Sequence, residues 1–164
     1  MAGGLLTCIF KENANTILNL FKGWQYVRKT EVVVGITEGS NATRESGVSN
    51  AELLYLHENG VPSHNIPPRP VLKPAIADAP TKMKIEKLMK EAMKEALVHG
   101  NVQKCEQNFH KAGMTGRDAC KKWITDGSHL APNAPATVAR KGSSLPLVDT
   151  GSMLNSIDYE VRKK

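Results

Sequence analysis

Aromatic side chains are scarce in this chain, at 5% of all residues, and long hydrophobic runs are missing. No apolar run approaches the ~20 residues that a membrane-spanning helix needs. The first ten residues contain no basic group, so we expect no secretory signal and no contact with a membrane. The shortage of aromatic residues predicts a core built mostly from aliphatic side chains.

Cysteine is also rare. Cys8, Cys105 and Cys120 are far apart, no two form a CxxC motif, and no cluster with histidine has the spacing of zinc ligands. A buried cysteine behaves as a small hydrophobic residue and needs no further function. We therefore expect three reduced thiols in a protein of the cytosol.

Signatures of the common catalytic sites are missing as well. The chain has no GxSxG, GxxxxGK[ST], GxGxxG or HExxH motif, and its five histidines are scattered. His57 lies on a predicted helix without a carboxylate or second histidine at i+3 or i+4, so we assign it a structural role. We expect no catalytic residue, no cofactor and no metal site.

The signals that are present predict one α+β domain covering residues 1–164. Residues 31–36 contain three consecutive valines that are typical of a strand, and their apolar character on both faces predicts a central, covered strand. Residues 156–162 alternate strictly between apolar and charged side chains, which predicts a half-buried strand. We expect these two strands to pair, so that a small antiparallel sheet packs against long helices.

The predicted helices begin with residues 13–22, which end at Gly23. A second helix opens with Ser49 or Asn50 as its N-cap, and Glu52 is placed to form a capping box if the cap is Ser49. Residues 81–98 and 102–124 form the longest helices, and the short link between them predicts an antiparallel αα-hairpin. Gly113 and Gly116 predict a break or bend in the second of these helices.

Three segments have no clear pattern. Residues 1–12 are either a frayed arm or the start of the first helix. The polar loop 37–48 either merely connects two elements or has a function, as loops of this length often do. Residues 128–147 are irregular apart from a short helical stretch at 135–141. We take both loops as candidate contacts between subunits.

The net charge of +6 is concentrated in the middle of the chain. Residues 1–80 carry seven basic and seven acidic groups, residues 81–125 carry ten and five, and residues 126–164 carry five and four. Lys84, Lys87 and Lys94 are therefore candidate contacts to DNA or to an acidic protein surface. The alternative is a solvated helix face that is rich in lysine.

A proline-rich connector at residues 66–76 separates the predicted strand and short helix from the long helices. Its prolines fix their own φ angles and favour extended conformations in the preceding residues. Proline is also tolerated in the first turn of a helix. The connector is thus predicted to be stiff and to lead directly into a helix.

Three stretches of the chain, in this order, resemble a known family. They read AELLYLHENG at 51–60, IPPRPVL at 66–72, and PATVARKG followed by PLVDTGSMLNSI at 135–142 and 146–157. These resemble the patterns A-x-hydrophobic-H-E-x-G, I-P-x-R-P-F-L and P-x-T-x-x-x-K-G … P-L-x-D-T-G-x-L-x-x-S-I. Together they resemble the neck and tail-completion (virion morphogenesis) proteins of long-tailed bacteriophages, over about residues 30–162. Val71 stands where that family has an aromatic residue.

The resemblance implies a small α+β structural protein of the virion, made in the host cytoplasm. It implies a homo-oligomeric ring, expected to be a hexamer, at the head–tail junction. The implied partners are further copies of the chain, the head connector or head-closure protein, and the tail terminator or tail tube protein. Double-stranded DNA would pass through the ring without sequence-specific contacts.

The same motifs suggest roles for individual residues. Ile66, Pro67, Arg69, Pro70 and Leu72 are expected to fix the start of the long helical region. Arg69 makes either a buried or interfacial charge-assisted hydrogen bond, or remains exposed on a proline-rich turn. In the third motif, Asp149 and Thr150, followed by Gly151, are expected to cap the last short helix.

Two other functions remain open at this stage. One is a basic nucleic-acid-binding protein that acts alone. Only Phe109 and Trp123 provide aromatic rings in the basic region, which disfavours stacking on single strands. The other is the tail-terminator subunit, which differs from a neck protein more in its partners than in its fold.

Overall fold

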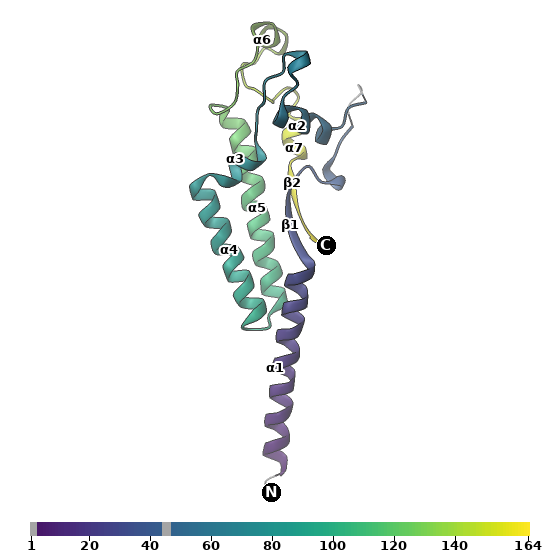
Figure 1. Cartoon of the computed structure of the whole chain (residues 1–164), viewed down its shortest axis with the longest axis vertical. Coiled ribbons are helices and arrows are strands. Elements are labelled where there is room, and N and C mark those ends of the chain that lie inside the picture. Colours follow the sequence, from purple (N-terminus) through teal and green to yellow (C-terminus); the bar gives the residue numbers. More distant parts are fainter. Residues whose placement is uncertain (1–2, 44–46) are drawn as a thin grey trace.

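The computed structural model describes residues 3–43 and 47–164, with side chains from residue 13 onward. Its helices are α1 (Gly3–Lys29), α2 (Asn50–Asn59), α3 (Leu72–Ala77), α4 (Ala79–Leu97), α5 (Val102–Asp126), α6 (Pro135–Lys141) and α7 (Ser152–Ser156). Its strands are β1 (Thr30–Gly35) and β2 (Asp158–Lys163), and short 3₁₀ turns occupy Glu38–Ser40 and Pro62–His64. The molecule is elongated, with α1 extending from one end and α2, α6 and α7 at the other (Figure 1).

The two strands pair in antiparallel register from Thr30 opposite Lys163 to Gly35 opposite Asp158. This confirms the predicted α+β fold and the predicted pairing of distant chain segments. The expectation of a central strand is wrong, because the described sheet has two strands and β1 has β2 as its one neighbour. Val32 and Val34 pack into the core, whereas Val33 alternates to the other face and stays half-buried.

The predicted αα-hairpin is confirmed by α4 and α5, which pack along each other. Ala92 and Ala96 of α4 are completely buried against Cys105 and Phe109 of α5. Small side chains on α4 let the two helix axes approach while Phe109 fills the space beside them. Gly100 closes the hairpin at a positive φ of 63°, a conformation that glycine adopts without strain.

The expected break in α5 is wrong, because the helix continues through Gly113 and Gly116. A Cβ atom on Gly113 would lie 2.3 Å from the Tyr159 ring, and one on Gly116 would lie 2.9 Å from a Val34 methyl group. The two glycines therefore give the sheet room to lie against α5. Helical glycine costs about 1 kcal/mol relative to alanine, and this close packing offsets that cost.

The first helix is longer than the sequence predicts, since it runs through Gly23 to Lys29. Gly23 is buried, and a Cβ atom there would lie 2.1 Å from the carbonyl oxygen of Ala96. Gly23 therefore marks a close contact between α1 and α4 and not a helix end. Residues 3–12 belong to α1, while residues 1–2 of the predicted arm and 44–46 of loop 37–48 lie outside the described residues.

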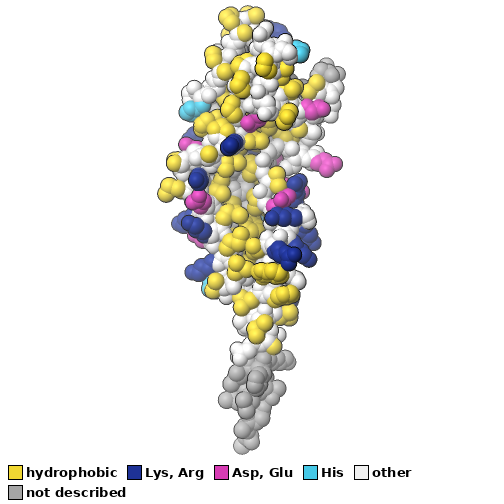
Figure 2. Space-filling model, viewed as in Figure 1, with side chains coloured by type: hydrophobic (Ala, Val, Ile, Leu, Met, Phe, Trp, Pro, Cys, Tyr) yellow, Lys and Arg dark blue, Asp and Glu magenta, His cyan; other side chains and the backbone are white. Residues whose placement is uncertain are grey.

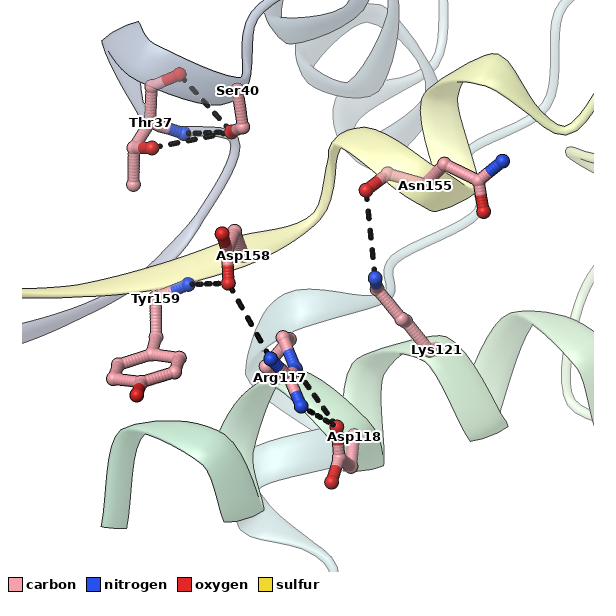
Figure 3. A network of polar contacts seen from close by, with 8 residues as sticks. All are labelled: Thr37, Ser40, Arg117, Asp118, Lys121, Asn155, Asp158 and Tyr159. Carbon is pink, nitrogen blue, oxygen red and sulfur yellow. Dashed lines mark hydrogen bonds and ion pairs between the residues drawn. The ribbon is translucent and has the colours of Figure 1, made fainter. Parts of the chain in front are cut away.

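A polar network fastens β2 to α5 (Figure 3). The Arg117 guanidinium donates a 2.8 Å hydrogen bond to Asp118, lies 3.7 Å from Asp158, and stacks 5.7 Å from the centre of the Tyr159 ring. The hydrogen bond to Asp118, followed by the charges of nearby acids, raises the pKa of Arg117. Lys121 adds a 3.5 Å contact to the Asn155 carbonyl at the end of α7.

The thiols of Cys105 and Cys120 are free and buried, as expected for reduced cysteines, while the side chain of Cys8 lies outside the described ones. Burial is the largest cause that raises the pKa of Cys105 to about 11 and that of Cys120 to about 12. Over the described residues, no helix has the length and apolar character required to cross a membrane.

Candidate functional site

The three stretches that carry the family resemblance come together at one end of the molecule (Figure 1). We call this region the motif junction and define it as α2, the connector 66–72, the segment 128–147 and α7. The predicted capping box that starts α2 is confirmed, with Ser49 and Glu52 exchanging hydrogen bonds. Polar contacts also join segments of the motif junction that are up to about a hundred residues apart in the sequence.

Glu58, at the end of α2, holds the start of α3. One of its carboxylate oxygens accepts hydrogen bonds from the backbone N–H groups of Val71 (2.8 Å) and Leu72 (2.6 Å). The N–H of Arg69 donates to the His57 carbonyl at 2.6 Å. The two bonds to Glu58 satisfy donors that the start of a helix leaves without partners. The start of the long helical region therefore depends on α2 as well as on the prolines.

Arg69 has an exposed fraction of only 7%, so the alternative of an exposed arginine is wrong. Its Nε donates to the Ala131 carbonyl at 2.7 Å and its Nη2 to the Pro132 carbonyl at 2.9 Å. Burial lowers the pKa of the guanidinium, which stays charged because that pKa is normally far above neutral. This forked arrangement ties the connector to the segment 128–147.

The other connector residues have different environments. Ile66 and Pro67 line a hollow, Pro70 is exposed, and Leu72 packs against the core. Val71, at the position where the family has an aromatic residue, is completely buried in that core. Valine is therefore accommodated at the centre of the packed cluster.

Asn50 connects α2 to α7. Its side-chain amide is completely buried and donates 2.9 Å hydrogen bonds to the hydroxyl groups of Ser152 and Ser156. Both hydroxyl groups lie on one face of α7, four residues apart. Through this amide, the residue that directly precedes the first family motif is bonded to two serines of the third.

The expected cap of the last short helix is only partly right. The residue that precedes α7 is Gly151, at a φ of 79°, with no side-chain capping bond. Thr150 contributes a 3.3 Å contact, in which its hydroxyl oxygen accepts from the N–H of Ser152. Asp149 does not occupy the capping position, because the chain turns at Gly151; it lines the hollow instead.

Residues of the motif junction line a hollow of about 750 Å³ that is open to solvent. Its charged and imidazole side chains are His57, His64, Arg69, Arg140, Lys141 and Asp149. Arg140 and Lys141 come from α6, the short helix predicted at 135–141 and confirmed at Pro135–Lys141. Because cations outnumber the single carboxylate, the hollow favours an acidic partner.

The predicted lysines are not brought together. Lys84 lines a groove of about 620 Å³ between α4 and α5, but Lys87 and Lys94 are exposed on α4 outside its lining. The other lysines of the groove are Lys111 and Lys122 of α5. Figure 2 shows hydrophobic side chains in a band along the long axis, with lysine and arginine on both edges.

Sequence reasoning missed Glu58, Asn50, Lys111 and Lys122. Glu58 carried a signal, since it belongs to the first family motif and precedes Gly60. Lys111 and Lys122 are eleven residues apart, which places them on the same side of a helix. Asn50 carried no signal, because its partners are about a hundred residues away.

Nothing in the described part of the chain assembles a metal site, since no group of three or more His, Cys, Asp or Glu side chains is suitably placed. The contacts of the motif junction join distant segments of the chain to one another. No family model, curated protein or solved structure matches this chain.

Proposed function

We propose that this protein is a ring-forming structural subunit of the neck of a long-tailed phage, where it completes the tail and joins it to the head connector. One observation carries the proposal. The three family motifs are far apart in the sequence, yet Glu58 of the first motif bonds the second, and Asn50, which directly precedes the first motif, bonds two serines of the third. Arg69 of the second motif bonds the segment that leads into the third. A chance likeness of separate short motifs gives no reason for such a cluster. The proposed location is therefore the virion, after synthesis in the host cytoplasm.

The chemistry of the motif junction suits a binding surface. The hollow has two cations from α6, the exposed Arg140 and the half-buried Lys141, and its walls come from the connector and the segment 128–147. Such a surface fits acidic side chains of a neighbouring neck component, such as the head-closure or tail-terminator protein. We propose that the motif junction faces that neighbour.

The test is sedimentation of the purified protein with connector-bearing heads and, separately, with tail tubes. We expect the protein to pellet with at least one kind of particle and to stay there in the presence of excess free DNA. Arg140→Glu should weaken this binding. Lys90→Glu makes an equal charge change at an exposed position of α4 and should not weaken it. A protein that pellets with neither particle contradicts the proposal. Binding to tail tubes alone would favour the tail-terminator alternative.

A second function is favoured by the groove that contains Lys84, Lys111 and Lys122. A basic protein that acts alone would bind DNA phosphates through such a groove. Each lost phosphate contact would reduce the slope of log affinity against log salt by about 0.9. Changing these three lysines to glutamine should then reduce the slope, whereas the same change at Lys87, Lys90 and Lys94 should not. DNA binding by the monomer without particle binding would establish this alternative.

A further inference from the structure

Helix α1 has two apolar faces, and its own chain covers only one of them. On the covered face, Gly23 approaches the backbone of Ala96 and Tyr26 stacks on Phe109 with ring centres 6.2 Å apart. The opposite face has a stripe of large hydrophobic side chains, formed by Ile17, Leu18, Phe21 and Trp24. Contiguous exposed apolar side chains of this kind mark a surface for contact with a partner.

The α1 stripe, as we call these four residues, is widely exposed. Ile17 has an exposed fraction of 67% and Phe21 one of 52%. Ile17, Phe21 and Trp24 repeat with the spacing of residues that contact a partner in helix packing. Phe21 and Trp24 already stack on each other, with ring centres 5.9 Å apart. The stripe therefore presents a continuous apolar surface to which another apolar surface can bind.

A second exposed apolar surface lies on α2. Val48, Ala51, Tyr55 and Leu56, together with Glu52, line a shallow open hollow that we call the α2 patch. Tyr55 has an exposed fraction of 69%. In Figure 1 the free part of α1 and α2 lie in different parts of the elongated molecule, with β1 between them. Contact between stripe and patch therefore requires two copies of the chain.

The charges of the two surfaces are opposite. From residue 13 to 29, the charged side chains of α1 are Lys22, Arg28 and Lys29, all basic and exposed. The charged side chain of the α2 patch is Glu52, which is acidic and exposed. Opposite charges beside matching apolar surfaces favour association. The lysine groove between α4 and α5 is a poor site for α1, because both are basic.

We infer that the α1 stripe of one copy docks on the α2 patch of a second copy. The two surfaces differ, so the contact is head-to-tail, and contacts of this kind generate closed rings when the rotation between copies closes. This inference rests on the proposed function, since it assigns the contact between neighbouring subunits of the ring. Both surfaces remain outside the hollow of the motif junction, which stays free for a different partner.

The test uses two substitutions, one in each surface, and each is chosen to block that surface; we call the resulting proteins the blocked variants. Phe21→Glu places a negative charge opposite Glu52, and Tyr55→Lys places a positive charge opposite the basic residues of α1. Met83→Glu is the control, because Met83 has an exposed fraction of 70% and lies outside both surfaces. All three positions are exposed, so the fold should remain intact, which circular dichroism checks. We expect each blocked variant to lose at least about tenfold in self-association, and the control to lose none.

Mixing the two blocked variants gives the sharper result. One variant retains an intact patch and the other an intact stripe, so an equimolar mixture should regain the association that each variant alone has lost. Association is read by native mass and by cross-linking, both in solution and on connector-bearing heads. Oligomers that either blocked variant still forms contradict the inference but leave the proposed function standing. Monomers of the unaltered protein in both settings contradict the two together.

Discussion

Gly23 shows how one residue sets the distance between two elements. Its missing side chain lets the backbone of α1 lie directly against the Ala96 carbonyl of α4. In the sequence, a glycine after an amphipathic stretch has the same appearance whether it ends the helix or makes a close contact. The two cases predict opposite effects of a methyl group at this position.

We expect Gly23→Ala to destabilise the protein by about 1–3 kcal/mol, because the added methyl group would push α1 away from the backbone of α4. If Gly23 merely interrupted an exposed helix, alanine would stabilise it by about 1 kcal/mol. Urea denaturation followed by circular dichroism measures the difference. Gly39→Ala serves as the control, since no atom lies within 4 Å of the added group. A stabilised Gly23→Ala variant contradicts the proposed contact between helices.

Glu58 is the residue on which the start of α3 depends. We expect Glu58→Ala to lower the free energy of unfolding by about 1–3 kcal/mol, because it leaves two backbone donors without an acceptor. Glu58→Gln keeps one amide oxygen as acceptor and should cost less. Glu91→Ala on the exposed side of α4 is the matched control. Equal stability of all three variants would contradict the assigned role.

The buried thiols make a prediction about pH. The pKa values of Cys105 and Cys120 are raised in the folded protein, to about 11 and about 12. Their contribution to stability is complete below the pKa of the unfolded thiols, about 8.5, and is lost as the pH rises through the folded values. Stability should therefore fall with rising pH above about 9.

Reactivity with a thiol reagent checks the same point. In a Cys8→Ser background, at about pH 8, both remaining thiols should stay unreactive until the protein unfolds. In urea, two thiols per chain should react at once. Rapid reaction of a thiol in the folded protein would contradict the burial of Cys105 and Cys120.

At the scale of elements, most helices and both strands were predictable from the sequence because their signals are local. The alternation at 156–162, the capping box at Ser49 and the short link at 99–101 each depend on neighbouring residues. The errors came from long-range contacts. Gly113 and Gly116 have a structural reason only once Tyr159 and Val34 lie against α5.

The candidate site was predictable to a smaller extent. The motifs indicated Arg69 and the connector, but the carbonyls that Arg69 binds are more than sixty residues away. The position of Gly151 as the residue before α7 follows from a turn whose geometry the sequence does not specify. The charge count selected α4, whereas the groove takes its other lysines from α5.

Asn50 provides a prediction about the packing of elements. We expect Asn50→Ala to loosen α7, because the hydroxyl groups of Ser152 and Ser156 lose the amide that binds both. Hydrogen exchange should then become faster at residues 152–156, with little change in α4. Asn59→Ala is the control, since the Asn59 side chain donates its hydrogen bond within α2, to the Tyr55 carbonyl. Unchanged exchange in α7 contradicts this link.

At the scale of the whole molecule, the chain has distinct surfaces in different places. The motif junction presents a basic hollow at one end, α1 presents an apolar stripe towards the other, and the α2 patch is acidic and apolar. A monomer that acts alone has no use for matched surfaces that cannot meet within one chain. A ring whose subunits contact each other and also bind a neighbouring protein uses all three.

The native mass of the purified protein tests this account most directly, measured alone and then with connector-bearing heads or tail tubes. We predict a discrete closed oligomer, with six times the 17.9 kDa of one chain as the expected mass, or a monomer that becomes such an oligomer on the particles. A monomer that ignores both particles and binds DNA in a salt-dependent manner would contradict the account and favour the nucleic-acid-binding alternative.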